Sequence, residues 1–450
     1  MKKIFQYIML AVVTIVMASC TSDIAETTIT AGKSNVQLVV SEFPAFGDSQ
    51  TRAIGTPDPG KTSWAVGDEL LLEIDNTSYG RHNATFTYNG KSWELTSGEL
   101  VYLEGDPAYI SHVYYAPNYK WSNSSLMLKK GKVAGTDELI EGKARITGNG
   151  ETITVSFAEA TRKYSRLRIA TLPNEQITVD TEYFTPAGSS DMEQNGNYTL
   201  TSDEKGNAYL YGTFENNSEV TVKYREAALT TYTFSQATES AKSYALDATV
   251  ISANSAEEIK SAIEQKVADG KTTIRLNLAP NAGTDEFMAI REAIKGAAPN
   301  DEGTIELTII GVETIPKEAF YKMLQLKSVR MSDVKEIKEY AFKECQYLTV
   351  VEAPSLNKLN SGAFNKCNLL SKLTFGPINY ADERNWPIFE YITPNIDLIL
   401  SDYQKEMIET DSYLYTANND RDYAGSDEHN SKNFLGREFK SITCRYKVEY

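Results

Sequence analysis

The pattern of hydrophobic and polar positions divides the chain at about residue 250. Before that point, short runs of alternating apolar and polar residues are separated by turns, as in Thr85–Tyr88 followed by Asn89-Gly90. A period of two directs every second side chain to the same face of a β-strand. We therefore expect two all-β domains, at residues 34–160 and 161–250. The other clear strands are Val36–Val40, Leu70–Ile74, Val113–Tyr115, Thr152–Phe157, Arg166–Ile169, Ala208–Tyr211 and Glu219–Tyr224.

Helical spacing of apolar residues begins after residue 250. Ser255 and Glu258 have the spacing of a capping box at the start of a helix. Apolar residues then recur at helical spacing, at Ile259, Ile263 and Val267. A second helix is expected at Glu286–Lys295, and strands at Ile274–Leu278 and Ile305–Ile310. We therefore expect residues 251–450 to form an α/β domain.

A pattern with a 22-residue period follows. The pair Ala-Phe recurs at Ala319-Phe320, Ala341-Phe342 and Ala363-Phe364. Positions 22 residues apart form a column, and seven columns stay apolar over three repeats. Ala and Phe are two of them, and the other five are Val312/Val334/Leu356, Ile315/Ile337/Leu359, Met323/Cys345/Cys367, Leu326/Leu348/Leu370 and Val329/Val351/Leu373. This period is typical of a solenoid, whose repeats bury their apolar faces against one another. Each repeat is predicted to place a helix turn at Ala-Phe and then a short strand, such as Lys327–Met331 or Thr349–Ala353.

The regular phase of the repeats degrades after Phe375. A last strand is expected at Ile396–Leu400, and Phe434, Phe439 and Ile442 are expected to close the open end. Cys345 and Cys367 share one apolar column, so we interpret them as buried small hydrophobic residues. A disulfide or redox pair between them is the alternative.

The first residues have the features of an export signal. Lys2 and Lys3 precede an apolar stretch from Ile4 to Met17, which is too short to span a bilayer comfortably. The stretch ends in Met17-Ala-Ser-Cys20, which resembles the lipobox of bacterial lipoproteins. The resemblance implies a signal peptide at 1–19, lipidation of Cys20, a tether at 20–33 and a lipid-anchored protein of the outer membrane, at the cell surface. The alternative is a plain cleaved signal in which Cys20 is incidental.

Composition narrows the function classes. With 61 acidic and 45 basic residues, the net charge of −16 argues against nucleic acid as a partner. The three histidines, His82, His112 and His429, lie far apart, and no nucleophile elbow or nucleotide-binding loop is present. We therefore expect no enzyme and no cofactor, although carboxylate pairs are numerous enough to leave a glycosidase open. The acidic stretch 418–428 suits calcium, but a solvated loop is the favoured interpretation, so no metal is expected.

The 22-residue repeat, which runs Ile-Pro-Lys-Glu-Ala-Phe-x-x-Met-x-x-Leu-x-x-Val at 315–329, resembles the BspA-like leucine-rich repeats. The family's usual glycine after the isoleucine is replaced by Pro316, Lys338 and Asn360, which leaves the turn geometry open. The resemblance implies a leucine-rich-repeat solenoid at 251–450 with a C-terminal cap. Members of the family are mostly bacterial surface proteins implicated in adhesion.

The N-terminal part resembles the fimbrillin-like (Mfa-like) proteins. The motifs that carry the resemblance are Thr51-Arg52-Ala53, Trp64–Leu70, Tyr114–Pro117 and the pair Val155–Phe157 and Leu167–Ile169. The resemblance implies two transthyretin-like β-sandwiches. In some members an arginine-directed protease removes the first strand, so cleavage between Arg52 and Ala53 is a hypothesis, with an ordinary loop arginine as the alternative. The chain ends in repeats instead of a polymerising strand, which favours a tip, accessory or free-standing adhesin.

The sequence therefore predicts a multidomain surface lipoprotein that acts as an adhesin, with its solenoid presenting a face to a host or bacterial protein or glycan. Exposed strand positions are the candidates for that face: Lys327, Arg330, Thr349, Glu352, Lys372 and Thr374. Two alternatives stay open. One is an accessory or tip subunit that joins fimbrial subunits by strand donation, and the other is a secreted polymer-degrading enzyme.

Overall fold

The computed structural model describes residues 36–404 and 433–446, except for 41, 45, 47–59, 77–79, 99–107, 123–124, 149–152, 190–192, 254, 383–385, 403 and 436. The predicted signal peptide, tether and lipidated Cys20 lie outside the described residues, as do Arg52, Ala53, the acidic stretch and His429. Contacts divide the chain into two compact units. The first comprises residues 1–222 and 230–248, and the second residues 223–229 and 249–450.

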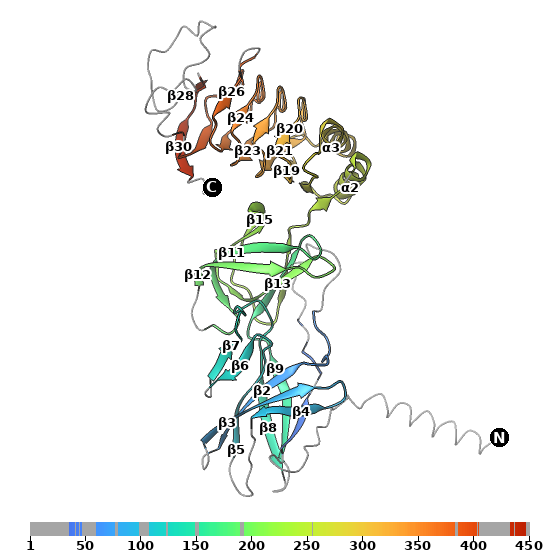
Figure 1. Ribbon diagram of the computed structural model, residues 1–450, viewed down its shortest axis with the longest axis vertical. Helices are drawn as coiled ribbons and strands as arrows, with labels where there is room; N and C mark the ends of the chain where they lie inside the picture. Colours follow the sequence, from blue (N-terminus) through green and yellow to red (C-terminus); the bar gives the residue numbers. More distant parts are fainter. Residues whose placement is uncertain are drawn as a thin grey trace, which may run out of the picture. The chain divides into compact units, whose positions relative to one another are not determined.

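The first unit contains a seven-stranded sheet at residues 36–161 (Figure 1). Its order is β1 (Val36–Val40), β9 (Ile153–Thr161), β8 (Ile140–Gly148), β5 (Ala108–Tyr115), β2 (Glu69–Asn76), β3 (Gly80–Tyr88) and β4 (Trp93–Gly98). All neighbours are antiparallel except β1, which lies parallel to β9 at one edge. Phe43 and Trp93 pack edge-to-face against Trp64 in the core of this sheet. A separate hairpin consists of β6 (Tyr119–Ser122) and β7 (Ser125–Leu128).

A second antiparallel-rich sheet follows, in the order β15 (Ala227–Thr233), β14 (Glu219–Tyr224), β11 (Gln176–Pro186), β13 (Asn207–Phe214), β10 (Ser165–Ala170) and β16 (Ser243–Asp247), with β12 (Glu193–Thr201) on β11. Buried and half-buried residues alternate along β13. Phe184, Phe214 and Phe234 stack with ring centroids 4.4 and 4.8 Å apart. The strands predicted from alternation before residue 250 are all present, so the expectation of an all-β N-terminal part is confirmed.

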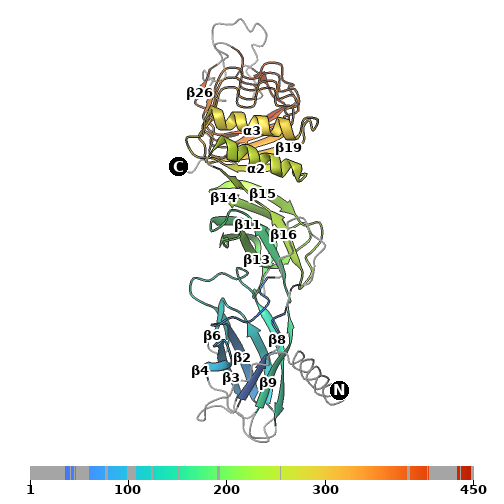
Figure 2. The ribbon, with the colours of Figure 1, turned by 90° about the vertical axis from the view of Figure 1, so that its right-hand side faces the viewer.

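The main part of the second unit, residues 249–450, begins with β17 (Ile251–Ser252), α2 (Ala256–Ala268), β18 (Thr273–Asn277), α3 (Thr284–Ala297) and β19 (Ile305–Ile310). Figure 2 shows the two helices side by side, next to β19. The Ser255 hydroxyl accepts a hydrogen bond from the Glu258 N–H at 3.3 Å, so the serine half of the predicted capping box is confirmed. At α3, the Glu286 carboxylate accepts one from the Gly283 N–H at 2.8 Å. Both predicted helices are therefore confirmed.

The repeats then stack into two parallel sheets. The larger sheet continues from β17, β18 and β19 through β21 (Leu326–Met331), β23 (Val350–Ala353), β25 (Lys372–Phe375), β27 (Asp397–Ser401) and β30 (Ser441–Tyr446). The smaller one contains β20 (Thr314–Ile315), β22 (Glu336–Ile337), β24 (Lys358–Leu359) and β26 (Tyr380–Ala381). Val329 lies opposite Val351, and Val351 opposite Leu373, so neighbouring strands keep the 22-residue register.

The apolar columns of the repeat form the core of the second unit. Every residue of the seven columns is at most 5% exposed, which confirms the predicted burial. Phe342 stacks on Phe320 and Phe364 with centroid distances of 5.1 and 5.3 Å. Phe434 and Phe439 are buried in the same core.

The repeats continue past Phe375, where the phase of the sequence is lost. Phe389 stacks on Phe364 with centroids 5.7 Å apart, and Lys372 pairs with Asp397 across neighbouring strands. The partners in each pair are 25 positions apart in the sequence, whereas earlier repeats pair at 22. The loss of phase therefore marks an insertion within the next repeat and not the end of the stack.

The helix turn predicted at Ala-Phe is wrong. The backbone turns there instead, with left-handed residues at Glu318, Tyr340 and Gly362 before each pair and at Lys322, Glu344 and Lys366 after it. Left-handed residues on both sides prevent a helical run. The freed donors bond to the next repeat, as when the Phe320 N–H donates to the Ala341 carbonyl at 2.8 Å and the Phe342 N–H to the Ala363 carbonyl at 2.9 Å.

This geometry predicts opposite tolerance at two left-handed positions. A Cβ added at Gly362, where φ is +64°, would lie 2.6 Å from the Tyr340 ring. We expect Gly362→Ala to lower the free energy of unfolding by about 1–2 kcal/mol. Lys366 also has a left-handed backbone, with φ +60°. Lys366→Gly relieves the strain of that conformation, and this gain offsets the entropy cost of glycine. We therefore expect the free energy of unfolding to change by less than about 0.5 kcal/mol. Urea unfolding of both variants checks this, and equal losses would contradict it.

Candidate functional site

Five of the six predicted face residues come together on, or directly before, neighbouring strands of the larger parallel sheet. Lys327 is exposed, while Arg330, Thr349, Glu352 and Lys372 are half-buried. Thr374 is only 3% exposed, so its placement on an exposed face was wrong. It lies in register between Glu352 and Ile399 of the neighbouring strands. A binding role for the other five residues stays a prediction.

The charges on this sheet face are paired with one another. The Lys327 ammonium lies 2.8 Å from the Glu306 carboxylate, and the Arg330 guanidinium 3.0 Å from that of Glu352. The Lys372 ammonium lies 3.6 Å from the same Glu352 carboxylate. Exposed pairs of this kind contribute at most about 1 kcal/mol each to stability. A partner that covered them would have to desolvate paired charges, so the sheet face is a poor binding surface.

A different surface of the repeats carries one exposed and two half-buried aromatic side chains. The Lys343 ammonium lies 4.9 Å from the Tyr340 ring centroid, 5.4 Å from that of Trp386 and 6.0 Å from that of Tyr321. Trp386 is 43% exposed. We call these four residues the aromatic edge. Tyr321, Tyr340 and Lys343 lie at the turns beside the Ala-Phe pairs. Trp386 comes from the stack beyond them, where its carbonyl accepts a hydrogen bond from the Gly362 N–H at 3.1 Å.

The position of Gly362 makes the aromatic edge possible. Because it has no Cβ, the Tyr340 ring can lie against its backbone, and a Cβ there would also come within 3.4 Å of Trp386. Sequence reasoning missed this surface because it followed the columns that stay apolar in every repeat. Tyr321, Tyr340 and Trp386 lie outside those columns, and none of them recurs at the same position of another repeat. The signal that could have located them is that Tyr340 and Gly362 occupy equivalent turn positions in neighbouring repeats.

Cys345 and Cys367 are buried free thiols, which confirms the packing interpretation and not the disulfide. Their thiols donate to the Phe320 and Phe342 carbonyls at 2.9 and 3.0 Å. Burial raises the pKa of Cys345 to about 12 and holds the pKa of Cys367 well above its usual value. Neither thiol therefore has the thiolate character of a reactive cysteine.

Thiol labelling checks this assignment. With iodoacetamide at pH 8, we expect Cys345 and Cys367 to stay unmodified in the folded protein, because both are buried and protonated. Both should react fully in denaturant, which provides the control. Peptide mass spectrometry measures the result, and rapid labelling of either thiol without denaturant would contradict the assignment.

Of the two described histidines, His112 is held by neighbouring side chains. His112 stacks on Tyr114, and its Nδ1 lies 3.1 Å from the Glu141 carboxylate.

Within the described part of the chain, no group of three or more histidine, cysteine, aspartate or glutamate residues could hold a metal ion. No helix in the same residues is long and apolar enough to cross a membrane. The expectation that the chain is not an enzyme stays a prediction.

The repeat geometry agrees with a comparison to known families. Residues 310–409 match the family model described as BspA type Leucine rich repeat region, with six copies. These residues are BspA-type leucine-rich repeats. The match begins after the two helices and covers the aromatic edge. No curated protein matches the chain. The resemblance of the N-terminal part to fimbrillin-like proteins, and the lipoprotein signal, stay predictions.

Proposed function

We propose that the protein is a lipid-anchored adhesin of the outer membrane, and that its BspA-type repeats bind a protein or glycan on a host or bacterial surface. Surface location and adhesion are common in this repeat family, and the lipobox-like sequence ending at Cys20 would supply the anchor. In this proposal the repeats form a solenoid that acts as a rigid support. The transthyretin-like sandwiches implied for the N-terminal part would hold it away from the membrane.

The observation that carries the proposal is the aromatic edge. Tryptophan and tyrosine supply large contact areas at low entropy cost and dominate the energetics of many interfaces. Tyr340 and Trp386 are held beside Lys343 by the turns of a rigid stack, so little further ordering is needed on binding. The predicted residues of the sheet face include no aromatic side chain, and its charged side chains already pair with one another.

Binding of the full chain to immobilised matrix proteins and mucin glycans tests the proposal. We expect a Tyr340→Ala/Trp386→Ala double variant to lose at least about tenfold in affinity for whichever of these the wild type binds. The matched control is Lys327→Ala/Arg330→Ala on the sheet face, which should bind as the wild type does. Failure of the wild type to bind any of them, or loss only in the control, would contradict the proposal.

The position of β1 favours a second candidate, a fimbrial accessory subunit that joins others by strand donation. β1 lies at the edge of its sheet, and Leu38 and Val40 are buried in the core. Removal of β1 would uncover the edge of β9 and an apolar groove, which a strand from another subunit could fill. A mature N-terminus at Ala53 would support this candidate, as would SDS-stable oligomers that form only after the chain up to Arg52, with β1, is removed. A mature N-terminus at Cys20 would contradict processing at Arg52.

A further inference from the structure

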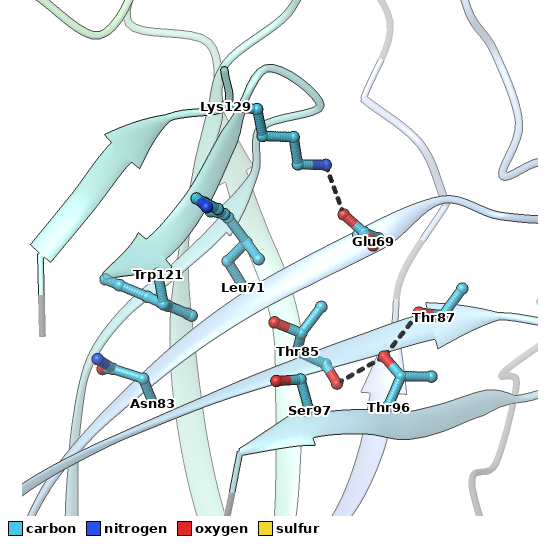
Figure 3. A pocket seen from close by; sticks show the side chains of 10 residues that line it. Glu69, Leu71, Asn83, Thr85, Thr87, Thr96, Ser97, Trp121 and Lys129 are labelled. Carbon is cyan, nitrogen blue, oxygen red and sulfur yellow. Dashed lines mark hydrogen bonds and ion pairs between the residues drawn. The ribbon is translucent and has the colours of Figure 1, made fainter. Parts of the chain in front are cut away.

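The first unit contains a pocket of about 470 Å³ between the hairpin β6–β7 and the strands β2, β3 and β4 (Figure 3). Its volume falls in the range typical of small-molecule sites, about 300–1,000 Å³. The pocket lies in a different unit from the BspA-type repeats, so it is independent of the proposed function. The residues that line it are Glu69, Leu71, Asn83, Thr85, Thr87, Thr96, Ser97, Lys120, Trp121 and Lys129.

The strand alternation explains why one wall of the pocket is a row of hydroxyls. Ala84 and Phe86 of β3 are buried in the core, so Thr85 and Thr87 face the opposite side. The Thr96 hydroxyl on β4 donates to the Thr85 carbonyl at 3.2 Å and lies 2.8 Å from the Thr87 hydroxyl. These hydroxyls are therefore ordered before any ligand arrives, which lowers the entropy cost of binding.

The opposite wall carries an aromatic ring. Trp121 comes from β6 of the hairpin, and its orientation is fixed by an edge-to-face contact with Tyr114 at 6.1 Å. The indole Nε1 of Trp121 and the Oδ1 of Asn83 are shielded from water and have no hydrogen-bond partner among the described residues. Unpaired polar atoms of this kind cost free energy. Both atoms are covered by the protein itself, so a ligand would contact the ring face of Trp121 and not these two atoms.

The charges of the pocket nearly cancel. The Lys129 ammonium lies 2.8 Å from the Glu69 carboxylate, which leaves Lys120 as the cation on the lining without such a partner in the described residues. A nucleic acid would need several cations, and an apolar ligand would displace water from the hydroxyl row without replacing its hydrogen bonds. Leu71, the aliphatic residue of the lining, is only 2% exposed, so an apolar peptide side chain gains little here.

A ligand with many hydroxyls and an apolar C–H face fits this combination. We propose that the pocket binds a saccharide of one or two rings, with the C–H face of a ring packed on Trp121 and its hydroxyls bonded to the threonine row. The protein then holds two separate binding sites, one on the aromatic edge of the repeats and one in the first β-domain.

Saturation-transfer NMR on the full chain tests the proposal with a panel of hexoses, N-acetylhexosamines, uronates and their disaccharides. We expect at least one to bind, and Trp121→Ala to weaken it by about tenfold or more. Thr87→Val preserves shape and strand propensity while removing one hydroxyl, so it should weaken binding without unfolding the pocket. Lys120→Gln should weaken only the uronates.

Two variants outside the pocket act as controls. Thr221→Val removes one hydroxyl of a similar cross-strand pair, in which the Thr221 and Thr231 hydroxyls lie 2.9 Å apart, and Trp386→Ala removes a tryptophan of the aromatic edge. Both should bind the saccharide as the wild type does. The proposal is overturned if no saccharide of the panel binds, or if binding survives Trp121→Ala. Loss in Trp386→Ala alone would place the saccharide on the aromatic edge, and would also overturn the pocket.

Discussion

Replacing Phe342 by alanine is expected to lower the free energy of unfolding of the repeat region by about 3–5 kcal/mol. Phe342 is fully buried and stacks between Phe320 and Phe364, so the substitution leaves a cavity in the middle of a continuous ladder. In a stack of repeats each repeat is stabilised by its neighbours, so this loss affects two interfaces at once. A deficit of this size is a large part of the stability of an ordinary domain, roughly 5–15 kcal/mol.

The matched control is Leu369→Ala, which also removes apolar atoms from a repeat but at a side chain that is 51% exposed. We expect a change below about 0.5 kcal/mol there. Calorimetry should show a lower midpoint for the repeat transition in the Phe342 variant and an almost unchanged one in the Leu369 variant. Equal midpoints would show that the aromatic ladder does not hold the repeats together.

Replacing Arg162 by alanine is expected to destabilise the first unit by about 3–5 kcal/mol. The side chains of Arg162 and Glu138 are both nearly fully buried, and the Arg162 Nη1 lies 3.1 Å from the Glu138 carboxylate. Burial raises the pKa of Glu138 although Arg162 is beside it, so desolvation outweighs the attraction of the guanidinium. Removal of Arg162 leaves a buried carboxylate without its partner. It also removes the Nε and Nη2 donors to the Pro44 carbonyl, at 3.1 and 2.8 Å.

A double variant separates the charge from the packing. In Arg162→Met/Glu138→Leu both charges are absent and most of the volume is kept, so we expect it to recover more than half of the stability that Arg162→Ala loses. Urea unfolding of the single and double variants measures this difference. If the double variant is as unstable as the single one, the loss comes from packing and from the Pro44 contacts, and not from the unpaired carboxylate.

The repeat core could be predicted from the sequence because its apolar residues recur at a fixed spacing. Each column residue, such as Val329, Val351 and Leu373, meets the same surroundings in every repeat, so the same kind of side chain recurs at that position of each repeat. The turns could not be predicted in the same way. The left-handed positions at Glu318 and Lys322 carry ordinary side chains, and their strain is offset by hydrogen bonds to the next repeat that only the stack provides.

Functional surfaces were the least predictable part, because they depend on which single residues become neighbours. Thr374 lies in register with the half-buried Glu352 yet is only 3% exposed, and nothing in the sequence pattern separates the two positions. Trp386 lies after the phase of the repeat is lost, so no pattern connects it to Tyr340 and Lys343. The pocket beside Trp121 depends on a hairpin that packs near strands from well before it in the sequence.

The most direct measurement of the proposed function is lysine footprinting of the full chain with and without a bound mucin glycan or matrix protein. Acetylation reports the exposure of each lysine, and the two candidate surfaces carry different ones. We expect the partner to protect Lys343 of the aromatic edge and to leave Lys327 and Lys372 of the sheet face as reactive as before. Protection of Lys327 and Lys372 with Lys343 unchanged would contradict it and return the binding surface to the sheet face.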